Sequence, residues 1–389
     1  NSQVIASTGG LGKAGNLIIE AEEVNIFDGS VLGSVTGKKF ADSGDIIFIN
    51  TEILNLNNRA EINTKTSNGI SGNIHIPDLN TLILNDNSLI SANTFNGQAG
   101  NINISAVEEV KIKNQSRIVS RATDKGNSGS ILIQANDVSL SNGGKISVTT
   151  KSGTSGNIQL QNLNTLQLND NSAISATTSD GTAGNILVNA IDSINIETSS
   201  KLASEAVSDG IAGNININTN QLEISANSQA SVNSEGNGNA GNILINANDI
   251  LLLDKAKISA KTTESGTDGN ITINSLNSLE LFDSSIGAST YNGEAGDIKI
   301  NATNIVKLLA KSHISSKAKE SGIAGELNIT TNQLQMADSS YINVSAKNNG
   351  TAGNILINAK DAVLNNQANI SATTEFGNSG NITLQNLQT

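Results

Sequence analysis

Apolar residues alternate with polar ones over short stretches of this chain, and the stretches recur about every 28 residues. A period of two is typical of β-strands rather than helices, so each repeat is predicted to hold three short strands, separated by turns rich in Asn, Asp and Gly. One side of each strand is expected to point inward. In the repeat that starts at Gly156 the expected inward residues are Ile158, Leu160, Leu166, Leu168, Ile174 and Ala176.

Each repeat opens on G-x-x-G-N followed by an apolar-x-apolar strand, and we take the second glycine as the anchor of one coil. The anchors follow one another at intervals of 27 to 29 residues. They are Gly15, Gly44, Gly72, Gly100, Gly129, Gly156, Gly184, Gly213, Gly241, Gly269, Gly296, Gly325, Gly353 and Gly380. A period in this range indicates a solenoid. The predicted fold class is therefore all-β, a parallel β-helix (β-solenoid) of about 14 coils of about 28 residues.

Residues 1–389 are predicted to form a single parallel β-helix repeat domain. Residues 1–10 match the second half of a coil, and the coil that opens at Gly380 stops early. Both ends are therefore expected to be cut mid-coil. A bare end of a β-stack exposes unpaired backbone groups, so we expect a segment of a longer array, or ends that stack on other copies.

The glycine pair has a predicted local cause. All coils but one place a glycine three residues before the anchor, and Ala41 is the exception. The residue just before the anchor is Ala or Ser in every coil except one, which holds Asp268. A corner that requires positive φ and close backbone approach would select glycine. The polar residue after the anchor, such as Asn185, could form Asx turns or a ladder along the stack.

Composition limits the function classes. Aromatic residues make up 2% of the chain and cysteine is absent, which predicts layers of aliphatic residues and excludes disulfides and thiolate metal sites. The net charge of −12 and the pI near 4.7 disfavour a nucleic-acid partner. No transmembrane segment is predicted, because the longest aliphatic run is only Ile250 to Leu253.

Four acids occupy one equivalent turn position in related coils: Glu52, Asp137, Asp249 and Asp361. They could line a calcium site. Hard cations require six to eight oxygens, however, and each of these acids stands alone in its turn several coils from the next. We favour a turn-stabilising role, so no metal site is predicted.

The other titratable residues singled out are also predicted to lie on the solvent-exposed surface. The two histidines, His75 and His313, lie at different coil positions, and the adjacent pairs Glu22-Glu23 and Glu108-Glu109 should face opposite sides of a strand. Enzymes on β-helices break the repeat where several charged residues converge, and no such break is found. No catalytic or cofactor-binding residue and no cofactor are therefore predicted, and the protein is not expected to be an enzyme.

Some aliphatic residues are predicted to face outward. Ile47, Leu132, Leu244 and Leu356 occupy the middle of the first strand in one coil type, with Leu252 in the next strand of one of these coils. They could be partly covered by a neighbouring loop. Alternatively, they form a periodic apolar row that serves lateral association.

The repeats SGNIxI, L-x-L-N-D-N-S, I-S-A-x-T and G-x-A-G-N-I-x-I-N-A resemble, over essentially the whole chain, the filamentous haemagglutinin-like exoproteins of two-partner secretion systems, particularly the large cyanobacterial type. The resemblance implies a right-handed parallel β-helix exported through an outer-membrane transporter, its secretion partner. The secretion domain of that family, with its Asn-Pro motifs, is not in this sequence, whose single proline is Pro77.

The expected function is a non-catalytic stalk or fibre of a secreted, cell-surface or extracellular-matrix protein that supports adhesion, aggregation or biofilm formation. The alternative is a glycan- or surface-binding adhesin module, and a polysaccharide-degrading enzyme is the third reading. The expected location is extracellular or at a bacterial cell surface. Expected partners are further copies of the chain, end to end or laterally, and glycans or cell surfaces.

Overall fold

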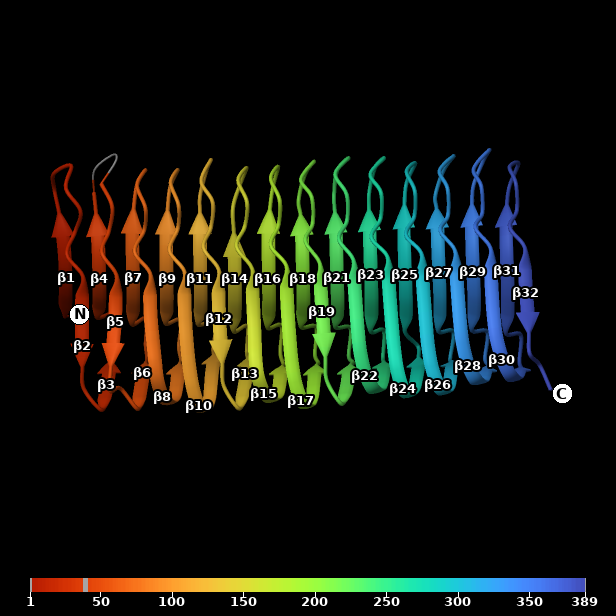
Figure 1. The fold of residues 1–389 in the computed structure, drawn as a ribbon, viewed down its shortest axis with the longest axis horizontal. Helices are drawn as coiled ribbons and strands as arrows, with labels where there is room; N and C mark the ends of the chain where they lie inside the picture. The colour runs from red at the N-terminus through yellow and green to blue at the C-terminus, as the bar shows by residue number, and fades with distance from the viewer. Residues whose placement is uncertain (1, 38–40, 389) are drawn as a thin grey trace. The chain divides into compact units, whose positions relative to one another are not determined.

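The computed structural model describes residues 2–37 and 41–388, and these contain strands and turns without a helix. The chain divides into two compact units, residues 1–191 and 192–389, each of which is a parallel β-solenoid. Within each unit, every coil lays its strands alongside those of the coil before it (Figure 1). The predicted β-solenoid of about 28 residues per coil is thus confirmed.

One strand of each coil is short and joins a sheet that we call sheet A. In the first unit sheet A runs in the order β1 (Gln3–Thr8), β4 (Val31–Thr36), β7 (Glu61–Thr66), β9 (Leu89–Thr94), β11 (Arg117–Ala122), β14 (Lys145–Thr149) and β16 (Ala173–Thr178). In the second unit its order is β18 (Lys201–Ala206), β21 (Gln229–Ser234), β23 (Lys257–Thr262), β25 (Ser285–Thr290), β27 (His313–Ala318), β29 (Tyr341–Ala346) and β31 (Asn369–Thr374). The pairing is parallel and in register, as where Arg117 lies beside Lys145.

The remaining strands form sheet B, which contains the first two predicted strands of each coil. These are separate in β2 (Leu17–Glu20) and β3 (Glu23–Ile26), β5 (Ile46–Ile49) and β6 (Ile53–Leu56), β12 (Ile131–Gln134) and β13 (Asp137–Ser141), and β19 (Ile215–Asn218) and β20 (Gln221–Ile224). They run on as one strand in β8 (Ile74–Leu84), β10 (Ile102–Lys113), β15 (Ile158–Leu168), β17 (Ile186–Ile196), β22 (Ile243–Leu253), β24 (Ile271–Phe282), β26 (Ile298–Leu309), β28 (Leu327–Met336) and β30 (Ile355–Leu364); the last strand is β32 (Ile382–Gln385). The predicted three strands per coil are therefore present only in the coils whose first two strands are separate; in the other coils these two strands are one continuous strand.

The core is a set of aliphatic layers, as the alternation predicts. All six inward residues expected in the coil of Gly156 are fully buried, with 0% exposure. Burial of each aliphatic side chain contributes about 1.5–3 kcal/mol, and the atoms that cover it come from neighbouring coils. A coil is therefore stable only in a stack.

The prediction that Leu252 faces outward is wrong, because this residue is fully buried. In β22 two consecutive residues, Asn248 and Asp249, lie at the corner without being buried, and the register to β24 shifts there. A shift of one residue reverses which side chains point inward. Ile250 and Leu252 therefore enter the core.

Most anchor glycines are required by close approach of the backbone and not by positive φ; Gly15, where a Cβ would lie 3.9 Å from the nearest atom, is an exception. Among the described residues the only glycines with positive φ are Gly29 and Gly143, neither of which is an anchor, so that part of the prediction is wrong. A Cβ on Gly100 would lie less than 3.0 Å from the carbonyl group of Gly72 in the adjacent coil. Successive corners thus stack at a separation that admits no side chain.

Positive φ occurs instead at the turn that enters sheet A. Two consecutive residues adopt it in most coils, as at Asp86 and Asn87, with φ of 51° and 62°, and at Asp170 and Asn171, with 55° and 60°. Asn and Asp tolerate the left-handed region best among non-glycine residues. This explains the N-D-N-S segments before the short strands.

Candidate functional site

A ladder of hydrogen bonds follows the anchor glycines within each unit. The side-chain oxygen of Asn73 accepts the backbone N–H of Asn101 at 2.8 Å, and Asn101 in turn accepts that of Ser130 at 2.8 Å. In the second unit Asn242 accepts the N–H of Asn270 at 2.8 Å. Of the two predicted roles for this position, the structure contains the ladder. Its side-chain oxygens hold successive coils together.

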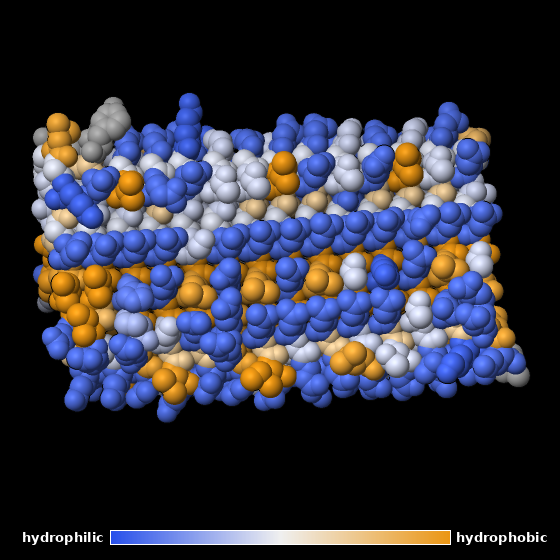
Figure 2. All heavy atoms as spheres, viewed as in Figure 1, coloured by the Kyte–Doolittle hydropathy of each residue, from blue (hydrophilic) through white to orange (hydrophobic). Residues whose placement is uncertain are grey.

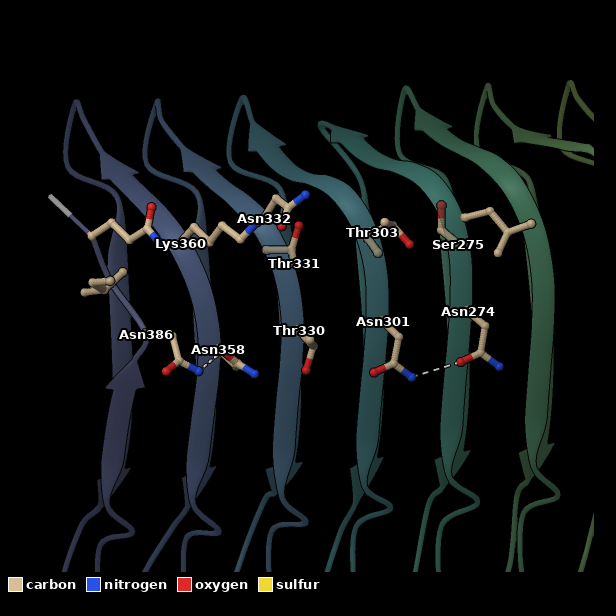
Figure 3. A pocket seen from close by; sticks show the side chains of 14 residues that line it. Asn274, Ser275, Asn301, Thr303, Thr330, Thr331, Asn332, Asn358, Lys360 and Asn386 are labelled. Carbon is tan, nitrogen blue, oxygen red and sulfur yellow. Dashed lines mark hydrogen bonds between the residues drawn. The ribbon is translucent and has the colours of Figure 1, made fainter.

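A second row of asparagines lies where the long strands of sheet B bend in the second unit. The Asn274 side chain donates to Asn246 at 2.9 Å, and Asn301 donates to Asn274 at 2.9 Å (Figure 3). The row continues after a break, where Asn386 donates to Asn358 at 2.7 Å. This row forms one wall of a polar groove.

We call this cavity of about 750 Å³ the amide groove. Its polar lining residues are Asn274, Ser275, Asn301, Thr303, Thr330, Thr331, Asn332, Asn358, Lys360, Asn386 and Gln388. They come from β24, β26, β28 and β30 and from the segment after β32. Leu276, which is 74% exposed, adds an apolar edge.

The amide groove owes its hydrogen-bonding capacity to Thr330. This residue stands in the asparagine row between Asn301 and Asn358, and its shorter side chain bonds to neither of them. The ladder is therefore interrupted, which leaves the Asn358 amide N–H groups and the Thr330 hydroxyl facing the groove. Lys360 forms no ion pair with any described residue and adds a cation.

Amides, hydroxyls and one ammonium group suit a ligand rich in hydroxyl groups. General acid–base hydrolysis of a glycoside needs two carboxyl groups on either side of the bond, and none lines the amide groove. The arrangement can therefore orient a sugar but offers no pair of acids to cleave it.

Hydrogen bonds account for three of the four acids at the equivalent turn position. Asp249 accepts from the Asn277 amide at 2.6 Å and from the Ser278 hydroxyl at 2.7 Å. Asp137 accepts from the Thr165 hydroxyl at 2.6 Å.

Glu52 accepts from the Asn80 amide at 3.3 Å, and Asp361 occupies the same corner of β30, in register with Gln333. Glu52, Asp137 and Asp249 are thus each tied to the next coil, and Asp249 also accepts from the adjacent Asn248 amide at 3.1 Å. Among the residues that the structure describes, no group of three His, Cys, Asp or Glu side chains could hold a metal ion.

The two histidines have different surroundings. His75 is exposed on β8. His313 on β27 stacks on the Tyr341 ring with a centroid distance of 4.7 Å and an interplanar angle of 6°. Burial, and then the positive charge of Lys317, lowers the pKa of His313 to about 4, so that its ring is neutral at pH 7.

The paired glutamates are on the surface. Glu22, Glu23 and Glu108 are exposed, and Glu109 forms an ion pair with Lys111. The Glu23 carboxylate accepts the Asn25 amide at 2.6 Å.

The outward aliphatic residues do not form a continuous row. Ile47, Leu132, Leu244 and Leu356 are half-buried. Polar residues occupy the same position in coils between them, such as Asn216 and Thr272, which pair in register with Leu244. Figure 2 accordingly shows apolar patches separated by polar side chains. The apolar row needed for lateral association is interrupted.

Asp268 is the buried acid whose surroundings the sequence did not reveal. It is only 4% exposed, and its Oδ2 atom has no hydrogen-bond partner. Burial raises its pKa to about 8, against the opposing effect of hydrogen bonds from Thr262. The only sequence signal was its place before an anchor, where the other coils have Ala or Ser.

No protein-family model, curated protein or solved structure matches this chain. No helix in the described part of the chain is long and apolar enough to span a membrane.

Proposed function

We propose that this chain is a non-catalytic structural element, the stalk or fibre of a secreted or cell-surface protein that supports adhesion, aggregation or biofilm formation. One observation carries the proposal. The buried aliphatic layers and the hydrogen-bond ladder that follows the anchor glycines recur from coil to coil, so that any coil can stack on the next. Such a design lets coils be added without redesign of the fold. The resemblance to filamentous haemagglutinin-like exoproteins supports the same role.

The experiment is an in-frame deletion of residues 241–352 in the host that makes the protein. The deletion removes four coils and joins Ala240 to Gly353, which continues with the same G-N-I-L-I-N-A sequence as Gly241. Surface labelling shows whether the shortened protein is displayed. A stalk predicts normal display with reduced cell–cell aggregation, and a duplication of the same block should restore or exceed the original level.

Unchanged aggregation by the displayed, shortened protein would overturn the stalk proposal. A matched variant with the four coils retained and Thr330→Asn introduced separates length from a local site. If that point variant abolishes aggregation as fully as the deletion does, a binding site rather than length is responsible.

The amide groove supports a second candidate function, the binding of a neutral glycan by an adhesin module. Its amides and hydroxyls match sugar hydroxyl groups, and Leu276 offers an apolar edge for a sugar ring. Titration calorimetry with neutral oligosaccharides tests this function. Thr330→Asn should fill the break in the row and abolish binding, whereas Thr272→Asn on the outer face of β24 is the control.

A further inference from the structure

The outer face of sheet A is basic, although the chain as a whole is acidic. In the first unit the outward residues of sheet A include Lys65, Arg117, Arg121 and Lys145 against the single acid Glu61. In the second unit they include Lys201, Lys257, Lys261 and Lys317 against the single acid Glu205. The net charge of the whole chain is −12. Because acids are scarce there, the outer face of sheet A carries a local excess of positive charge in each unit.

In the second unit three lysines and the neutral His313 ring surround a strip of small residues. The outward residues of β25 are Ser285, Gly287 and Ser289. Lys257 and His313 lie in register on either side of Ser285, and Lys261 and Lys317 lie on either side of Ser289. Alternate strands of a sheet are about 10 Å apart, so the two pairs face each other across one strand. We call these residues the sheet A patch.

Packing does not require the glycine at the centre of the patch. A Cβ at Gly287 would make only ordinary contact, 3.5 Å from the backbone oxygen of Ser315. In this respect Gly287 differs from the anchor glycines. Because it has no side chain, the middle of the strip is open to a ligand.

The lysines of the patch have no acidic partner. The four ion pairs among the described residues include neither Lys257, Lys261 nor Lys317. Asp268 is close enough to interact electrostatically with Lys261, but it is buried, and with a pKa of about 8 it is mostly neutral at pH 7. The positive charge of the patch is therefore available to an anion from outside.

The patch also contains an aromatic ring pair. The stacked rings of His313 and Tyr341 lie at its edge, and the Lys317 ammonium lies 5.2 Å from the Tyr341 ring centroid. The Asn343 amide adjoins them and donates to the Ser371 hydroxyl at 2.9 Å. Aromatic faces pack against apolar ring surfaces, while hydroxyls and amides bond to sugar hydroxyl groups.

We propose that the sheet A patch binds a polysaccharide that carries carboxylate or sulfate groups. The lysines would pair with the acidic groups, the serines with hydroxyls, and the aromatic ring pair with a sugar ring. A nucleic acid fits less well, because its successive bases need several aromatic side chains to stack on, and the patch offers a single ring pair. A membrane fits less well, because the outward residues of the patch include no aliphatic side chain to enter the lipid. This binding activity goes beyond the proposed stalk function.

The test is the double variant Lys261→Asn with Lys317→Ser, made in the full chain. Asn233 and Ser345 already occupy the equivalent positions of β21 and β29, so the replacements suit the stack. The probes are a polyuronate and dextran sulfate, with binding measured by biolayer interferometry at two salt concentrations. We expect affinity to fall at least tenfold, together with a weaker dependence on salt.

The control is Lys299→Asn with Lys307→Gln on sheet B, which removes the same charge. Asn328 and Gln335 are the register partners of these lysines in the adjacent coil. An equal loss of binding in the control would mean that net charge, and not the patch, is responsible, and would overturn the proposal. Tyr341→Asn, which copies Asn369 of β31, should weaken polysaccharide binding without altering the salt dependence.

Neutral dextran, single-stranded DNA and vesicles of anionic phospholipid complete the set of probes. Binding of the polyuronate alone identifies carboxylate as the recognised group, binding of dextran sulfate alone identifies sulfate, and either result supports the proposal. Tighter binding of DNA or vesicles than of both acidic polysaccharides would overturn it. The stalk proposal is judged separately by the four-coil deletion, because the patch variants leave the number of coils unchanged.

Discussion

The Asp268 carboxylate accepts two hydrogen bonds from Thr262, one from its backbone N–H at 2.5 Å and one from its hydroxyl at 2.8 Å. The Thr262 hydroxyl also lies 3.0 Å from that of Thr290 in the next coil. These groups are buried beside an anchor corner where the other coils place Ala or Ser. The carboxylate thus introduces a titratable group into a layer that is otherwise uncharged.

Stability is expected to depend on pH through Asp268. Its pKa is about 8 in the folded chain and about 4 when unfolded, so between these values the folded state holds a proton that the unfolded state releases. This contribution to stability is complete below about pH 4 and is lost as the pH rises toward 8, with a slope of up to about 1.4 kcal/mol per pH unit. Urea unfolding at pH 5 and pH 8.5 measures this change in the free energy of unfolding.

The Asp268→Ser variant provides the control for that measurement. Serine occupies the equivalent position in other coils, for example Ser128 and Ser155, so it should fit the corner. We expect the variant to be more stable than the original chain at pH 8.5, and the difference to shrink steadily as the pH falls toward 4. Parallel pH profiles for both chains would show that Asp268 is not the group responsible.

Replacement of an anchor glycine should be strongly destabilising. In Gly100→Ala the new Cβ would overlap backbone atoms of Gly72, which cannot move without separating the coils. We expect a loss of about 3 kcal/mol in the free energy of unfolding. Thermal unfolding followed by circular dichroism measures it.

Gly287→Ala is the matched control, because its Cβ would make only ordinary contacts. Its stability should change by less than about 0.5 kcal/mol. Equal effects of the two substitutions would contradict the explanation by close approach and would indicate a general intolerance of alanine.

The residue pairs with positive φ predict a stabilising substitution. Thr198 has φ of 53°, an unfavourable conformation for a β-branched residue, whereas Asp170 occupies the equivalent turn with φ of 55°. Thr198→Asn should therefore gain about 1 kcal/mol, and the reciprocal Asp170→Thr should lose about as much. Chemical denaturation measures the change in the free energy of unfolding for both variants, and this change must have opposite signs in the two.

The inward residues could be predicted from the sequence because a strand alternates strictly. The alternation that identifies Ile158 and Leu160 does not depend on how the chain turns elsewhere. It failed for Leu252 because the corner of that coil has one residue fewer, and a shift of one residue reverses the faces. The length of an irregular corner cannot be read from a pattern with a period of two.

The candidate sites could not be predicted, because they depend on register across coils. Lys261 and Lys317 are 56 residues apart in the chain (317 minus 261) and approach each other only across β25. The amide groove likewise depends on one threonine in a row of asparagines from different coils. Single-coil motifs do not contain these relationships, whereas the strand pairing specifies them.

Completion of the asparagine row is the last prediction. Thr330→Asn places an amide between Asn301 and Asn358, where it can accept from one side chain and donate to the other, as Asn274 does between Asn246 and Asn301. Each such bond contributes about 0.5–1.5 kcal/mol to stability. The amides that form the new bonds are otherwise hydrogen-bonded to water, so the net gain should lie at the low end of that range. Urea unfolding measures the gain, and Thr330→Val, which has the same shape but no hydroxyl group, provides the comparison. If Thr330→Asn is no more stable than Thr330→Val, the amide does not bridge the gap, and the open groove is then a property of the backbone and not of the threonine.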